Sequence, residues 1–132
     1  MIIKTLETEK HSQFINITKM VQQAVMESDL QSGTVTVFVP HTTAGTTINE
    51  NSDPDVCRDL LNGLERSFPW EHEDYQHAEG NTAAHMKASM MGNSTQVIVE
   101  HGLLQLGTWQ GIYFCEFDGP RNRQVWIKVV GV

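Results

Sequence analysis

The feature that most constrains the fold of this 132-residue chain is a series of four strand-like runs in its last forty residues. Each run is rich in β-branched, aromatic or alternating apolar residues, a composition typical of β-strands. The runs are QVIVE (96–100), LLQLG (103–107), WQGIYFCEF (109–117) and QVWIKVV (124–130). Because only the short turns HG, GT and DGPRNR separate them, we predict a β-meander that supplies much of the core.

The first half of the chain combines strand and helix signals. Strands are expected at residues 2–7, 14–17, 34–39 and 46–50, with the last two packed side by side. Thr18 is a plausible N-cap for a helix over residues 19–29. Pro40 should stop the strand at 34–39, which leaves His41 in the connection that follows.

Two further helices are predicted in the middle of the chain. Ser52 or Asp53 can cap a helix over residues 54–67, since Pro54 suits the first helical position. A second helix, TAAHMKASMM, should follow Asn81 or Thr82 and end at Gly92. The polar segment between these helices predicts an ordered functional loop. We therefore expect a single α+β domain over residues 1–132, with a β-sandwich-like core of mostly antiparallel strands and two or three helices.

Charge and hydropathy exclude several classes of function. Nine acidic residues and two arginines between residues 50 and 79 give this stretch a charge of -7, which equals the net charge of the chain. This acidity argues against general nucleic-acid binding. No run reaches the roughly 18 to 20 apolar residues that a membrane span needs, and the start of the chain does not read as a signal peptide. The expectation is a cytoplasmic protein.

Four of the six histidines lie within the same polar half of the chain as these carboxylates. His41, His77 and His85 belong to three separate elements and have small or hydroxyl-bearing neighbours, which leave room around each imidazole. Imidazoles beside carboxylates suit a divalent metal ion or acid–base chemistry. The alternative is a polar hydrogen-bonded network that holds the loop in place. For His11, His72 and His101 we expect a structural or surface role.

Two other segments have side chains suited to an oxyanion. HTTAGTTINEN combines hydroxyls, a glycine and amides that can cradle a phosphate, although threonine-rich turns are common without any ligand. In DGPRNR, Arg121 and Arg123 offer guanidinium groups that bind phosphate in a two-point contact. The alternative, slightly favoured, is a hairpin turn in which the two arginines pair with Glu116 or Asp118.

Four motifs together resemble the YjbQ-like family, also called the secondary thiamine-phosphate synthase family. They are HTTAGTTINEN, DPDV, YQHAEGNTAAH and GLLQLGTWQGIYFCEFDGPRNR, and the resemblance spans about residues 35–130. It implies a small α+β domain assembled as a homotrimer, with the histidines near a subunit interface. The site residues it implies are His41, His77 and His85 as metal or catalytic groups, Asp53 as a further catalytic group, and Asn49, Asn81, Gln110 and Arg121 as pocket residues.

The resemblance also implies a weak transferase activity. A thiamine-phosphate synthase joins hydroxymethylpyrimidine diphosphate to a thiazole phosphate and releases pyrophosphate. Because the chain has few lysines, a divalent ion would have to supply much of the positive charge, zinc at the histidines or magnesium with the diphosphate. Two alternatives remain open: a metal-dependent hydrolase or lyase that acts on a small phosphorylated metabolite, and a non-catalytic trimeric metal-binding protein.

Overall fold

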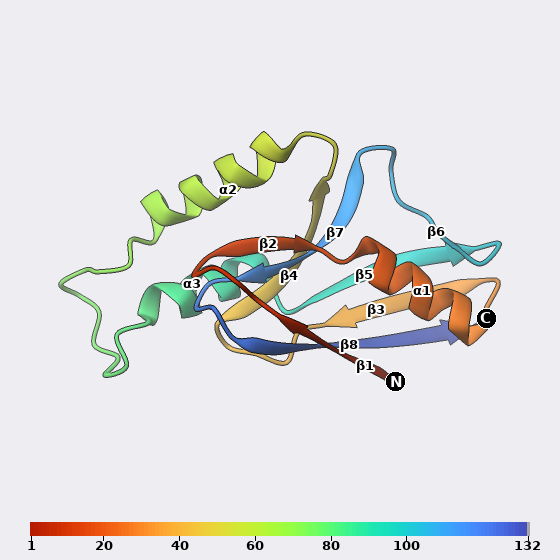
Figure 1. Cartoon of the computed structure of the whole chain (residues 1–132), viewed down its shortest axis with the longest axis horizontal. Helices are drawn as coiled ribbons and strands as arrows, with labels where there is room; N and C mark the ends of the chain where they lie inside the picture. The colour runs from red at the N-terminus through yellow and green to blue at the C-terminus, as the bar shows by residue number, and fades with distance from the viewer. Residues whose placement is uncertain (132) are drawn as a thin grey trace.

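The computed structural model describes residues 1–131, which form eight strands and three helices (Figure 1). In chain order the elements are β1 (Ile2–Glu7), β2 (Gln13–Asn16), α1 (Thr18–Ser28), β3 (Gly33–Phe38), β4 (Ala44–Glu50), α2 (Pro54–Ser67), α3 (Thr82–Met91), β5 (Ser94–Glu100), β6 (Leu103–Leu104), β7 (Gln110–Glu116) and β8 (Asn122–Gly131).

The strands form two antiparallel sheets, one of five strands in the order β1-β8-β3-β5-β6 and one of three in the order β2-β7-β4. The main core lies between them: Val35 and Val37 of β3 and Ile112 and Phe114 of β7 are fully buried in one cluster, which α1 joins through Val21. Burying each of these side chains stabilises the fold by about 1.5–3 kcal/mol. The predicted α+β class with a sandwich-like core of antiparallel strands is confirmed.

The last four strands do not form the predicted meander. Only β5 and β6 pair with each other, whereas β7 joins the three-stranded sheet and β8 lies between β1 and β3. The reason is visible in β7, which is buried on both faces. Ile112 and Phe114 face the main core, while Tyr113 and Cys115 face a second cluster that includes Ala84 of α3 and Leu61 of α2. A strand with two apolar faces needs a packed layer on each side.

A second expectation that the structure corrects is the pairing of the strands on either side of His41. β3 and β4 belong to different sheets, because the link from Val39 to Thr43 carries the chain from one sheet to the other. β4 pairs along its whole length with β7 instead. His41 still lies in this connection, as the position of Pro40 predicts.

The three predicted helices are present. α2 covers residues 54–67 as expected, and the Asp53 side chain accepts a hydrogen bond from the Asp55 amide at 2.9 Å. α1 begins at Thr18 itself, with Ile17 as its N-cap. Thr18 does not cap because its hydroxyl donates to the Asn16 side chain and accepts from the Ile112 amide. Within residues 1–131, α2 is the longest helix, and no helix is long and apolar enough to span a membrane.

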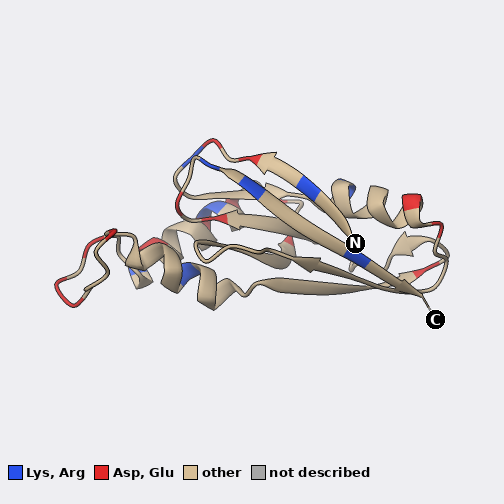
Figure 2. Cartoon of the chain, turned by 90° about the horizontal axis from the view of Figure 1, so that it is seen from below, with Lys and Arg blue, Asp and Glu red and all other residues tan. Residues whose placement is uncertain are grey.

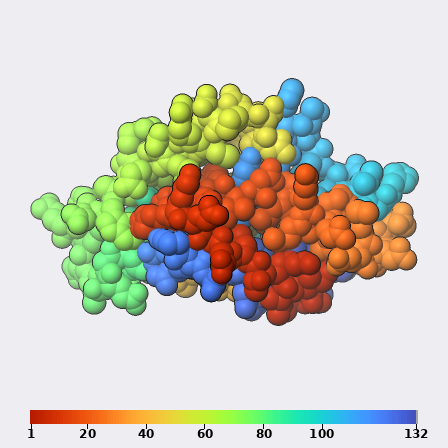
Figure 3. Space-filling view, viewed as in Figure 1, coloured from red at the N-terminus to blue at the C-terminus, as the bar shows by residue number. Residues whose placement is uncertain are grey.

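The segment between α2 and α3 extends from one end of the molecule, at the left of Figure 1. In Figure 2 the same loop lies at the left, and much of it is red because it contains acidic residues. This segment has internal contacts that hold its shape, since the Tyr75 hydroxyl donates to the Pro69 carbonyl at 2.8 Å. In the space-filling view the N-terminal strands cover the middle of the visible face, between α2 above and β8 below (Figure 3). The loop, α3 and the β7–β8 turn thus gather at one end.

Candidate functional site

His41 lies where the chain leaves β3, and its imidazole is held against the neighbouring strand β8. The Gln124 amide donates a hydrogen bond to His41 Nε2 at 2.9 Å. Since Nε2 is the acceptor, the neutral ring carries its proton on Nδ1. Burial lowers the pKa of His41, and the positive charge of Arg123 lowers it further. The ring is therefore held in its neutral form with Nδ1–H as a hydrogen-bond donor.

His77 and His85 meet at the N-terminal end of α3. His77 lies in the loop before the helix and His85 in the first helical turn, as predicted. Their ring centres are 5.2 Å apart and their planes meet at 86°, an edge-to-face arrangement. The loop after α2 and the first turn of α3 therefore bring two imidazoles into contact, although eight positions separate them in the chain.

Asp118, in the turn between β7 and β8, connects this turn to α3. Its carboxylate accepts a hydrogen bond from the Asn81 amide at 2.9 Å and from Arg121 Nη2 at 3.1 Å. Arg121 Nε also donates to the Asp118 backbone carbonyl at 2.7 Å. Asn81 is 7% exposed, and its Oδ1 atom is buried without a hydrogen-bond partner within residues 1–131. An unpartnered buried carbonyl oxygen is costly unless a donor or a cation satisfies it.

Arg123 is engaged in a buried ion pair. It donates from Nε and Nη2 to the Glu116 carboxylate, at 2.8 and 2.5 Å, and from Nη2 to the Thr43 hydroxyl at 2.8 Å. Glu116 is fully buried and also accepts from the Thr8 hydroxyl at 2.7 Å. Burial raises the pKa of Glu116, but the hydrogen bonds from Arg123, the Asp118 amide and Thr8, together with the charge of Arg123, outweigh this effect and leave the pKa below its usual range.

The ion pairs expected in the alternative interpretation of DGPRNR are confirmed, because Arg121 pairs with Asp118 and Arg123 with Glu116. The turn is not a hairpin, however, since β7 and β8 belong to different sheets. Two of the four threonine hydroxyls of HTTAGTTINEN form hydrogen bonds inside the fold as well. Thr43 accepts from Arg123, and Thr46 donates to the Tyr113 carbonyl at 2.8 Å. Within residues 1–131, neither Arg121 Nη1 nor Arg123 Nη1 makes a hydrogen bond, so each arginine retains a donor on that nitrogen.

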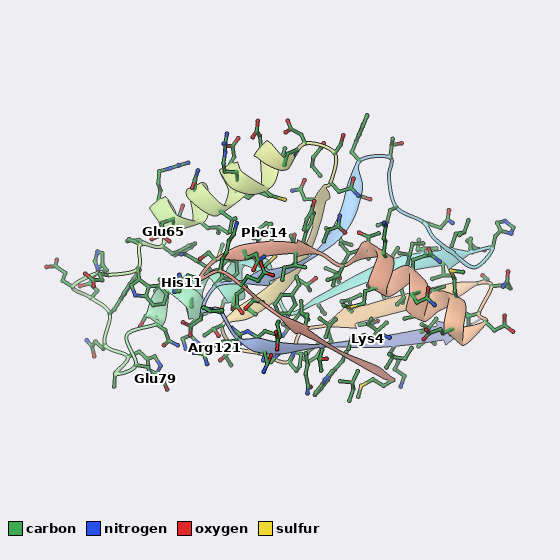
Figure 4. All side chains as sticks on the ribbon, in the orientation of Figure 1. Lys4, His11, Phe14, Glu65, Glu79 and Arg121 are labelled. Atoms are coloured by element: carbon green, nitrogen blue, oxygen red, sulfur yellow. The ribbon has the colours of Figure 1, made fainter. Side chains whose placement is uncertain are left out.

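One cavity of about 430 Å³ collects most of the predicted residues, and we call it the charged cavity. Five of the eight residues predicted for the site line it: His41, His77, Asn81, His85 and Arg121. Figure 4 shows Arg121 and Glu79 at the same end of the molecule as His11, whereas Lys4 lies toward the other end.

Residues that the sequence analysis did not assign to the site also line the charged cavity, chiefly Glu79 and Asp118. Both were visible in the sequence, Glu79 two positions after His77 and Asp118 three positions before Arg121. Their closeness in sequence to a predicted site residue is the signal that could have identified them.

The other three predicted residues lie at the opposite end of the β4–β7 pair. Asn49 and Gln110 belong to the last two residue pairs between β4 and β7, Asn49 opposite Gly111 and Gln110 opposite Glu50. Asp53 follows shortly after as the N-cap of α2. Six residues of strand separate this end from Ala44, which corresponds to roughly 20 Å. Within one chain, residues 49, 53 and 110 therefore do not share a cavity with the histidines.

The sequence predicts a metal site at His41, His77 and His85. Within residues 1–131, no three His, Cys, Asp or Glu side chains are grouped so that they could hold a metal ion as they stand. His41 Nε2 already accepts from Gln124. The other two histidines supply two imidazoles, ligands that zinc binds, and their ring centres are 5.2 Å apart. Glu79 and Asn81 add oxygen donors to the same lining.

Comparison with known proteins gives a consistent family assignment. The family model described as UPF0047 protein YjbQ-like matches residues 3–132. UPF0047 protein YugU of Bacillus subtilis (strain 168) is 55% identical over 132 residues, which cover 98% of this chain and all of YugU. UPF0047 protein MJ1081 of Methanocaldococcus jannaschii is 44% identical over 126 residues, 96% of this chain and 91% of the relative.

Solved structures agree with this assignment. The crystal structure of a YjbQ/UPF0047-family protein from Clostridium acetobutylicum matches with a TM-score of 0.97 and 57% identity, and covers 98% of this chain and all of that one. A YbjQ-like protein of unknown function from Sulfolobus solfataricus matches with a TM-score of 0.94 at 28% identity, over 99% of this chain and 96% of that one. This chain belongs to the YjbQ-like UPF0047 family.

Proposed function

We propose that this protein binds a small phosphorylated metabolite together with a divalent metal ion in the charged cavity, and that it has a weak thiamine-phosphate synthase activity. The observation that carries the proposal is the convergence of five predicted site residues on this one cavity. They come from the β3–β4 link, the loop after α2, the start of α3 and the β7–β8 turn. A cavity of this size, with a few convergent polar groups, is typical of small-molecule sites.

His77 and His85 would hold the ion, with the oxygen atoms of Glu79 or Asn81 as further donors. Imidazole nitrogens favour zinc, whereas magnesium would come with a diphosphate substrate. When bound, the ion supplies positive charge to the diphosphate oxygens. Two protein imidazoles leave coordination positions free for water or substrate, as in catalytic rather than structural sites.

An ion is needed because the cavity has no surplus of positive charge. It is lined by two arginines and two acidic residues, and both arginines already pair with carboxylates. Within residues 1–131, the donors left for a phosphate include Arg121 Nη1, Arg123 Nη1 and the Nδ1–H group of His41. The role we assign to Arg121 is to orient the phosphate, and that of His41 is to donate a hydrogen bond without adding charge.

In the proposed reaction the thiazole nitrogen forms a bond to the methylene carbon of the pyrimidine. The bond between that carbon and the diphosphate oxygen breaks, and its electron pair leaves with pyrophosphate. Hydrogen-bond donors aimed at the leaving oxygens stabilise the charge that develops on them. Arg121 Nη1, Arg123 Nη1 and His41 Nδ1–H are cavity groups suited to that role.

The first experiment measures metal content per chain by elemental analysis of protein purified without chelators. We expect close to one ion in the wild type and loss of the ion in His77→Ala and His85→Ala. His72→Ala is a matched control, because His72 lies in the same loop but does not line the charged cavity. Equal metal in His85→Ala and the wild type would contradict the proposed ion site.

The second experiment measures thiamine phosphate and pyrophosphate after incubation with both substrates. We expect slow formation of both products, decreased in Arg121→Ala and His85→Ala. Release of phosphate from one substrate alone would instead indicate the hydrolase alternative. Light scattering on the same samples tests the homotrimer that the family resemblance implies, since a trimer has three times the mass of the 14.9 kDa chain.

A further inference from the structure

A second cavity, of about 570 Å³, adjoins the charged cavity along α3. One wall is a single face of this helix, formed by His85, Ala88 and Ser89 at intervals of three and four residues from His85. Gly92, the C-cap of the helix, continues this wall. The facing wall is the start of β4 with the link before it, including Thr42. The groove thus runs between α3 and the β3–β4 connection.

The two cavities share His41, Thr42 and His85. These residues stand at the junction between them, so one ligand can occupy both cavities and lie against both imidazoles. The hydrogen bond from the Gln124 amide fixes the orientation of His41 at this junction.

The linings differ sharply in charge. The charged cavity contains Glu79, Asp118, Arg121 and Arg123, whereas among residues 1–131 no acidic residue, lysine or arginine lines the second cavity. We call the second one the uncharged cavity. A charged ligand group placed there would lose part of its hydration without gaining a counter-charge, which disfavours its binding.

The lining of the uncharged cavity combines small residues with two polar side chains. Three small residues, Ala44, Ala88 and Gly92, form part of the lining. Gly92 has φ +96° and nothing within 4 Å of the position that a Cβ atom would take, so the space beside it is open. Ser89 and Asn93 supply a hydroxyl and an amide to the lining, and such groups can bind ring nitrogens and amino substituents by hydrogen bonds.

We propose that the uncharged cavity binds the neutral, planar heterocycle of the same metabolite whose phosphate groups lie in the charged cavity. This proposal rests on the proposed function, because it assumes that the charged cavity takes the phosphates. It adds the position of the ring in the uncharged cavity, and it assigns Ser89 and Asn93 to recognition of the ring. In this arrangement His41 and His85 lie beside the bond that joins the ring of the metabolite to its phosphate-bearing part.

The test compares two probes by isothermal titration calorimetry, pyrophosphate and hydroxymethylpyrimidine diphosphate, with the same divalent ion present. We expect the ring to increase affinity about tenfold in the wild type, which corresponds to about 1.4 kcal/mol. Ser89→Trp fills the uncharged cavity from an exposed position and should abolish that increase while pyrophosphate affinity changes less than about twofold.

Met90→Trp is the matched control, because Met90 is 67% exposed on the same helix and lines neither cavity. Met86→Trp tests the competing hollow beneath Phe68 and Tyr75, which adjoins the charged cavity only through His77. Circular dichroism and thermal melting of each variant establish that its fold is intact before titration.

Three results would overturn the proposal, and they point to different errors. If pyrophosphate binds but the ring adds no affinity, or if Ser89→Trp behaves like Met90→Trp, the uncharged cavity does not bind the ring and the proposed function stands. If Met86→Trp alone abolishes the increase, the ring lies beneath the loop instead. If pyrophosphate itself does not bind, the proposed function fails and this assignment fails with it.

Discussion

The two ends of the β4–β7 pair differ in how their polar residues are used. At the Ala44–Glu116 end, Glu116 and Arg123 are buried and bind each other. At the Glu50–Gln110 end, the polar side chains are exposed and bind only nearby backbone: Asp53 accepts from the Asp55 amide, and Gln110 from the Gly107 amide.

This difference shows that similar residue types serve different purposes at the two ends. Buried charges at the first end require a complete set of partners, so they fix the positions of Thr43 and of the β7–β8 turn around the charged cavity. Exposed groups at the second end need no such precision, because water satisfies whatever they leave unpaired. We therefore expect mutations at the first end to affect stability and the cavity together, and those at the second to affect stability alone.

The largest effect should come from Arg123→Met, which leaves the fully buried Glu116 without its counter-charge. Removing one partner of a buried ion pair costs about 3–5 kcal/mol. Urea unfolding at neutral pH measures this loss. The double variant Arg123→Met/Glu116→Met should recover much of the stability, since packed apolar residues can replace a buried pair. A single-variant loss below about 1 kcal/mol would show that the pair does not anchor this end.

Thr8→Val should have the next largest effect, because Thr8 is buried and its hydroxyl has two roles at the same end. It donates to Glu116 at 2.7 Å and accepts from the Arg121 amide at 2.9 Å. Loss of a buried hydrogen-bonding group costs about 1–3 kcal/mol. Thr5→Val is the matched control on the exposed side of β1, and its stability should stay within about 0.5 kcal/mol of the wild type. Equal unfolding midpoints for the two variants would contradict this prediction.

Local signals in the sequence were sufficient for the elements and for part of the site. Asp53 and Pro54 predicted the start of α2 because capping depends on neighbouring residues alone. Pro40 likewise predicted that His41 follows the end of a strand, because this signal also depends on neighbouring residues alone. The division of strands between two sheets was not predicted, because pairing partners such as β4 and β7 lie some sixty residues apart. Alternation of apolar residues indicates a buried face, and it does not identify the strand beside it.

The same limit explains the division of the predicted site. Asn49 follows His41 by only eight positions, yet an extended strand carries it to the far end of the sheet. His77 and His85 are as far apart in sequence, but a loop and a helical turn bring their rings together. Sequence spacing alone does not distinguish these two cases, since the distance depends on the conformation of the intervening residues.

Asp53→Ala tests the separation of the two ends. It removes the N-cap of α2 and should lower stability by about 1 kcal/mol, without changing metal content or pyrophosphate affinity. Asp59→Ala, on the exposed face of α2, is the matched control and should stay within about 0.5 kcal/mol of the wild type. Loss of metal or pyrophosphate binding in Asp53→Ala would contradict the separation of the two ends, because the Glu50–Gln110 end would then contribute to the binding site.

The smallest effect concerns the pH dependence that His41 gives to the cavity end. Burial and the charge of Arg123 lower the pKa of His41, so between its folded pKa and the ordinary value of 6.5 the unfolded chain binds more protons. Stability should therefore fall as pH decreases through this window, and His41→Gln should remove that part of the slope. Urea unfolding between about pH 8 and pH 5.5, where carboxylates stay ionised, measures the difference. Identical slopes in the variant and the wild type would mean that His41 is no more difficult to protonate in the fold than in the unfolded chain, and Arg123 would then have no electrostatic influence at the junction of the two cavities.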